Sequence, residues 1–93
     1  MADKYAQFAR DCFRYRDRIR GELGDGYLEV LQPLMDTLRG VARLTGVSVV
    51  KAFERSVTPA VRDQDQLSIA LWSAALAELY ELREKALPGI GRG

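Results

Sequence analysis

The chain has 93 residues, of which 47% are hydrophobic and 29% charged, and its 14 Lys and Arg nearly balance its 13 Asp and Glu. This length suits one domain and this composition a globular chain, so two independent cores and an intrinsically disordered chain are both excluded. The sequence has no histidine, which removes the commonest general base and zinc ligand, and its single cysteine cannot form an intramolecular disulfide.

The chain shows no feature of a secreted or membrane-spanning protein. Its N-terminal segment lacks the apolar core of a signal peptide, and its most apolar stretch, residues 67–82, is interrupted by two serines and two glutamates. A spanning helix needs about 20 predominantly apolar residues. We therefore expect a cytoplasmic protein without a membrane span.

Apolar residues recur at helical spacing along almost the whole chain, which predicts an all-α protein. The expected fold is a small bundle of four helices, open to dimerisation, over residues 3–23, 26–45, 48–57 and 59–87. A single helical domain is expected over residues 1–88, followed by a flexible Gly-rich tail over residues 89–93.

The first predicted helix has one apolar and aromatic stripe, formed by Tyr5, Phe8, Cys12, Tyr15, Ile19 and Leu23. The triplet Gly24-Asp25-Gly26 is expected to end this helix, and Asp25 to cap the second. The apolar period of the second helix runs through Pro33, which favours one helix kinked at this residue. A separate helix with Pro33 in its first turn is the alternative.

Turn signals separate the remaining helices. Gly46 is suited to a left-handed residue after the second helix, and Ser48 to the N-cap of the third. Thr58-Pro59 repeats a cap followed by proline and predicts the start of the last helix, with Asp63 and Asp65 as competing starts. The last helix is expected to end at Leu87-Pro88-Gly89.

The last helix has the widest apolar surface, since its large apolar residues spread over about 220° at 100° per residue. One neighbouring helix cannot cover such an arc. The helix is therefore either central in its own domain or part of a dimer or partner interface. For the second case the expected interface residues are Trp72, Leu76, Leu79 and Tyr80.

Arg16 is the fifth candidate for a protein interface. It falls near the middle of the aromatic stripe of the first helix, where an arginine needs a carboxylate or a partner molecule. The other arginines of this helix alternate with acidic residues and are expected on a solvated face.

We expect no enzymatic activity, metal site, cofactor or small-molecule substrate. Cys12 lies on the aromatic stripe, and no histidine is present to activate it. Asp63 and Asp65 lack the pattern of a calcium loop, and helix capping explains them. The glycines around Asp25 lack the strand and the Lys-Ser/Thr pair of a phosphate loop.

Residues 41–49 combine a small residue at Ala42, glycine in the turn at Gly46, an apolar Val47 and a cap at Ser48. With their flanks, over residues 37–57, they resemble the helix-turn-helix of the mercury-resistance-regulator (MerR) and lac-repressor families, which are dimeric bacterial transcription regulators. The resemblance implies that residues 48–55 form the helix that enters the major groove.

In the register that the resemblance implies, Val49, Val50 and Phe53 point outward, and Ala52 and Arg55 point inward. The segment is also basic, with five basic residues and one acidic residue between positions 39 and 62. The nucleic-acid-binding candidates are Arg39, Arg43, Ser48, Lys51, Arg55 and Arg62.

Two functions follow from these observations. The first is a non-enzymatic helical protein of bacterial or phage origin, an adaptor, inhibitor or assembly subunit, that acts by protein–protein interaction and forms a homodimer. The alternative is a DNA-binding transcription regulator of the helix-turn-helix type.

Overall fold

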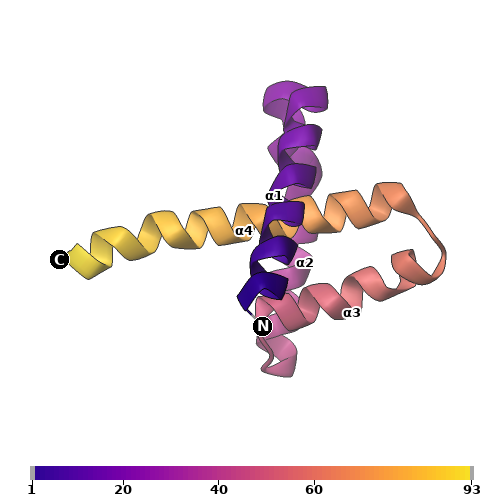
Figure 1. Cartoon of the computed structure of the whole chain (residues 1–93). Helices are drawn as coiled ribbons and strands as arrows, with labels where there is room; N and C mark the ends of the chain where they lie inside the picture. The colour runs from indigo at the N-terminus through magenta and orange to yellow at the C-terminus, as the bar shows by residue number, and fades with distance from the viewer. Residues whose placement is uncertain (1, 93) are drawn as a thin grey trace.

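The computed structural model describes the backbone of residues 2–92 and the side chains of Gln7 and residues 10–82. This part of the chain is all-α, as predicted, and its helices pack against one another (Figure 1). No helix within it is both long and apolar enough to cross a membrane. The elements in chain order are α1 (Ala2–Leu23), the 3₁₀ helix η1 (Gly24–Gly26), α2 (Tyr27–Thr45), α3 (Val49–Arg62) and α4 (Gln66–Arg92).

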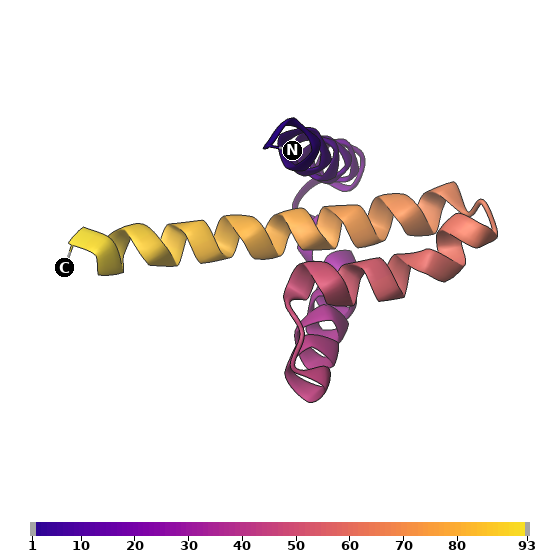
Figure 2. The same cartoon turned by 60° about the horizontal axis from the view of Figure 1, so that its bottom comes forward.

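Helix α4 is the centre of the fold. Helix α1 crosses it on one side, and α2 and α3 lie on the other (Figure 2). The six consecutive residues from Ser73 to Glu78 are all buried. Six consecutive residues point in every direction around a helix, so the middle of α4 is covered on all sides. Packing within the chain therefore explains the middle of the wide apolar arc predicted for this helix.

The two sides of α4 differ in the size of their side chains. Ala70, Ala74 and Ala77 share the side on which α1 crosses, because their spacing of four and three residues keeps them on one face. Small side chains at a crossing let two helices approach closely. On the opposite side, Leu76 belongs to the main core with buried side chains of α2 and α3. These are Leu31, Met35, Leu38, Ala52 and Phe53.

The turn between α2 and α3 forms as predicted. Gly46 follows α2 in the left-handed conformation, with φ of 70°, and its amide donates to the carbonyl of Ala42. Ser48 caps α3, since its Oγ accepts a hydrogen bond from the amide of Lys51 at 3.1 Å. The expected cap at Asp25 is wrong: Gly26 is the N-cap of α2 and no side chain bonds to that end.

The boundary between α3 and α4 differs from the prediction. Helix α3 does not end at Val57 but continues through Pro59 to Arg62. The reason lies at Thr58, whose Oγ1 donates back to the carbonyl of Glu54 at 2.6 Å and does not cap a new helix. Helix α4 starts at Gln66, and the competing start at Asp65 is confirmed. The carboxylate of Asp65 accepts hydrogen bonds from the amide and the hydroxyl of Ser68.

Two further proline positions are decided by the structure. Pro33 lies inside α2, which continues on both sides of it, so it does not begin a separate helix. The expected end of α4 at Leu87 is wrong, because the helical backbone runs through Pro88 to Arg92. A proline removes one backbone donor, and this loss does not end either helix. Residues 89–92, expected in a flexible tail, lie in α4, and Gly93 is outside the described residues.

The stripe of α1 is only partly buried. Cys12 and Ile19 are buried, but Leu23, on the same stripe, is 48% exposed. Two helices that cross touch over only a few turns, and Leu23 lies beyond that contact. The side chains of Tyr5 and Phe8, also predicted on this stripe, lie outside the described residues.

Candidate interaction surfaces

Arg16 forms the most connected polar cluster among the described residues, where α1 crosses α4. Its Nη1 donates to Glu78 Oε1 at 2.9 Å and also to Glu81 Oε2, and its Nε donates to Asp17 Oδ1 at 2.9 Å. Tyr27, at the start of α2, donates its hydroxyl to the same Glu78 oxygen at 2.9 Å. The cluster therefore joins three helices through one buried glutamate.

The electrostatics of this cluster keep the arginine charged. Burial opposes the charge of Arg16, but hydrogen bonds to Glu78, Glu81 and Asp17 outweigh burial and raise the pKa of the guanidinium above its usual value. Burial and the hydrogen bond to Glu78 raise the pKa of the Tyr27 hydroxyl. Both groups therefore remain protonated donors to Glu78 over the physiological range.

The five predicted protein-interface residues occupy two different environments. Leu76 is 1% exposed, because it packs with α2 and α3 within the chain. Arg16 is 7% exposed and finds its carboxylates inside the same chain. Trp72, Leu79 and Tyr80 are only half-buried, and these three remain available to a partner.

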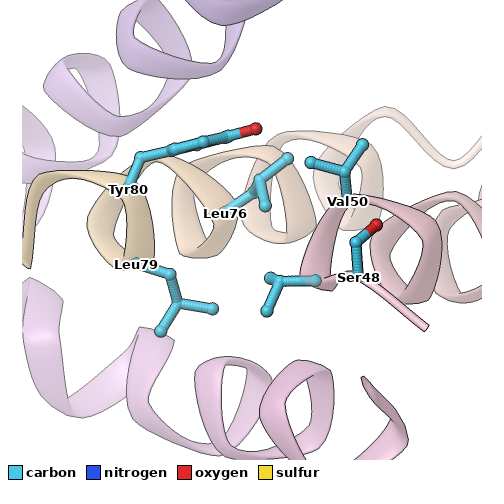
Figure 3. Close-up of a pocket in the computed structure, with 6 residues that line it drawn as sticks. Ser48, Val50, Leu76, Leu79 and Tyr80 are labelled. Carbon is cyan, nitrogen blue, oxygen red and sulfur yellow. The ribbon is translucent and has the colours of Figure 1, made fainter. Parts of the chain in front are cut away.

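An apolar groove lies between the start of α3 and α4, with a volume of about 90 Å³ (Figure 3). Ser48 and Val50 approach it from α3, and Leu76, Leu79 and Tyr80 from α4. Leu76 and Val50 point toward each other, while Leu79 and Tyr80 lie on the two flanks (Figure 3). The groove brings together three of the predicted interface residues, Leu76, Leu79 and Tyr80, and the cap of α3, which the sequence analysis assigned to separate surfaces.

All six predicted nucleic-acid-binding residues are exposed. Lys51, Arg55 and Arg62 lie on one stripe of α3, since their positions fall within about 40° at 100° per residue. Two of the six residues have acidic neighbours: Arg39 pairs with Asp36 at 3.0 Å and Lys51 with Glu54 at 3.6 Å. Within the described part of the chain no ion pair holds Arg43, Arg55 or Arg62.

The orientation of α3 differs from the register that the helix-turn-helix resemblance implies. Phe53 was expected to point outward and is 5% exposed, while Arg55 was expected to point inward and is exposed. Val49 and Val50 are half-buried against α4. The cause is α4, whose large apolar side requires the aromatic ring of Phe53 in the core. Only Ala52 lies inward as the register implies.

The acidic side chains and Cys12 are the candidates for metal binding or nucleophilic chemistry among the described residues. No group of three or more acidic or cysteine side chains among them could hold a metal ion. Cys12 is buried, and burial together with the nearby Asp11 raises the pKa of its thiol to about 11. A thiol with this pKa remains protonated and unreactive at neutral pH.

Sequence reasoning missed the partners of Arg16. Glu78 and Glu81 were noted only as interruptions of an apolar stretch. A signal was present, because both glutamates share the helical face of Ala74 and Ala77 and would meet whatever helix packs there. That this helix is α1 could not be deduced from the pattern.

Comparisons with known proteins add no relative. No protein-family profile, no curated protein and no solved structure matches the chain.

Proposed function

We propose that this chain is a non-enzymatic protein that acts by binding other proteins, including a second copy of itself. The groove between α3 and α4 carries the proposal. It is lined almost entirely by apolar side chains, and its flanking Leu79 and Tyr80 are only partly buried although they pack against the core. Exposed apolar surface beside a completed core is typical of a protein-binding site.

The groove suits an apolar side chain of a partner better than a cofactor. Its volume of about 90 Å³ is well below the roughly 300–1,000 Å³ of typical small-molecule sites. Tyr80 and the nearby Trp72 are of the residue types that most often anchor protein interfaces.

The partner chemistry is inferred from the charge of α3, the helix that forms one wall of the groove. Helix α3 presents Lys51, Arg55 and Arg62 on its outer stripe, and Arg43 lies at the end of α2. An acidic amphipathic helix could place an apolar side chain in the groove and a carboxylate near Lys51, which follows the groove residue Val50 in the sequence. We therefore propose an acidic amphipathic segment of another protein as the occupant.

The test uses two synthetic amphipathic helices, one built from Leu and Glu and the other from Leu and Lys, each labelled for fluorescence anisotropy. The Leu/Glu peptide is expected to bind, and the Leu/Lys peptide to bind at least about tenfold more weakly. Equal binding of both peptides, or binding of neither, contradicts the proposed partner.

Two variants locate the peptide. Tyr80→Ala and the double variant Lys51→Glu/Arg55→Glu are each expected to weaken binding by about tenfold. The matched control is Arg14→Glu/Arg18→Glu, which changes the net charge equally on α1, where both side chains are about three-quarters exposed at 76% and 75%. A control as harmful as the α3 variant would place the peptide elsewhere.

DNA binding is the second candidate, and the exposed basic stripe of α3 after a glycine turn favours it. Under this alternative, mixed-sequence duplex DNA is retarded in a mobility-shift assay, and less so at higher salt because phosphate contacts release counterions. Lys51→Glu/Arg55→Glu should abolish the shift, whereas Tyr80→Ala should leave it unchanged. The two variants together therefore separate DNA binding from peptide binding.

A further inference from the structure

Helix α1 is attached to the rest of the molecule on one side only. It packs on α4, contacts α2 only slightly, and has no comparable contact with α3. In Figure 2 it lies by itself on its side of α4. The described side chains that it buries are Cys12, Arg16 and Ile19. Helix α1 is therefore held to the rest of the chain almost entirely by its crossing with α4.

The connection from α1 to α2 is not held by packing. None of the residues of η1 is buried, and a Cβ added to Gly24 or Gly26 would meet no atom within 4 Å. Gly24 has φ of 64°, a conformation that glycine adopts at little cost. Another backbone conformation of η1 would bury or expose no side chain of η1 itself; the contact it would break is that of the Arg20 guanidinium over the Tyr27 ring, 5.6 Å from the ring centroid.

Large apolar side chains flank this connection without a partner in the core. Leu23, at the end of α1, is 48% exposed, and Leu28 and Val30, at the start of α2, are 42% and 41% exposed. They lie within seven residues of Gly24 in the sequence. The folded single chain gives no reason for this concentration of exposed apolar residues around a hinge.

We propose that two copies of the chain exchange α1 through the hinge at Gly24–Gly26. Helix α1 of each copy then packs on α4 of the other, and Arg16 of one copy pairs with Glu78 of the other. The exchange requires no new complementary surface for α1, because the dimer repeats contacts that the single chain already has. This exchange rests on the self-association proposed above, and the partner is a second copy of the same chain.

The exposed apolar residues give the dimer an advantage over the closed chain. A short connection holds α1 near its own α4 at an effective concentration of about millimolar, which favours the closed chain. In the exchanged dimer the two hinges run close together near the two-fold axis. This would bring Leu23 and Leu28 of both copies together, and their burial would offset the lost effective concentration.

The test uses charge reversal in separate chains. Arg16→Glu places like charges beside Glu78, and Glu78→Arg places like charges beside Arg16, so each variant alone should fold poorly. When the two variants are unfolded together and refolded, exchange restores an opposite-charge pair at both crossings. We expect a one-to-one heterodimer by light scattering and native mass spectrometry. The control is the double variant Arg16→Glu/Glu78→Arg in one chain, which shows whether the fold accepts a pair with its charges reversed.

The hinge supplies a second and independent test. Gly24→Ala strains the closed turn, because a left-handed φ disfavours a side chain, whereas Gly26 has φ of −75° and accepts alanine. Gly24→Ala is expected to raise the dimer association constant by about tenfold relative to Gly26→Ala. Leu28→Glu should lower this constant, while Leu44→Glu, at an 88% exposed position away from the hinge, should not.

The outcomes separate the exchange from self-association in general. A wild-type dimer with no heterodimer from the mixed variants overturns the exchange alone, provided that the double variant folds. If the double variant does not fold, the hinge variants decide: equal dimer fractions for Gly24→Ala and Gly26→Ala overturn the exchange of α1. A wild-type chain that stays monomeric at all concentrations overturns both the exchange and the proposed self-association, and leaves the α3–α4 groove untouched.

Discussion

Replacing Arg16 by methionine is expected to destabilise the α1–α4 crossing strongly. The side chains of Arg16 and Glu78 are 9% and 5% exposed, so removal of the guanidinium leaves a buried carboxylate with only the neutral Tyr27 hydroxyl as donor. Loss of one partner of a buried pair costs about 3–5 kcal/mol. Asp17 is 67% exposed, and its pair with Arg16 adds little.

The matched variant Glu78→Gln should cost less. The new amide side chain has the same shape as the carboxylate but no charge, and Arg16 keeps both Glu81 and Asp17 as partners. The expected loss is about 1–2 kcal/mol, the range for one changed hydrogen bond to a charged group. The order of the two losses therefore tests whether the buried glutamate, and not the exposed carboxylates, makes Arg16 important.

The assay is urea unfolding followed by the fluorescence of Trp72 and by circular dichroism, at one fixed protein concentration. With a typical slope of about 2 kcal/mol/M, a loss of about 4 kcal/mol moves the midpoint down by about 2 M urea. A loss below about 1 kcal/mol for Arg16→Met, or an equal loss for Glu78→Gln, would refute the reasoning.

Four further outcomes are expected. Because burial raises the pKa of the Cys12 thiol to about 11 from the ordinary 9.0, its contribution to stability should be complete below pH 9 and lost as the pH rises through 11, which urea midpoints of wild type and Cys12→Ala will show. The native thiol should also resist a thiol reagent at neutral pH until the chain is unfolded. Asp65→Ala should lower the melting temperature, since the pKa of the Asp65 carboxyl is held down by its hydrogen bonds to Ser68, whereas Asp63→Ala should not. Ala74→Leu should cost about 1–3 kcal/mol by overpacking the crossing of α1 and α4, measured by urea unfolding.

Local rules predicted the helices and several of their ends. Helical spacing of apolar residues identified an all-α chain, and the short-range chemistry of Gly46 and Ser48 fixed the turn between α2 and α3. Such signals succeed because a cap or a left-handed glycine depends on atoms a few residues apart. They failed at Thr58-Pro59, where the same residue types suit both the start of a helix and its interior.

The surfaces were less predictable than the helices. Arg16 was correctly singled out as an arginine on an apolar stripe that needs a counter-charge, but the choice between a carboxylate of the chain and a partner was left open. The groove at Leu79 and Tyr80 was anticipated only as an apolar face of α4, and its other wall, at Val50, belonged to a different hypothesis.

The sequence by itself determined the helical class, the absence of histidine chemistry, the turn at Gly46 and the requirement of Arg16 for a counter-charge. These are properties of composition or of residues close along the chain. Only the tertiary structure decided that α4 is central, that α1 crosses its alanine side, and that Glu78 meets both Arg16 and Tyr27. Those facts join residues separated by more than fifty positions, and helical periodicity states which face of a helix is apolar without stating which helix will cover it.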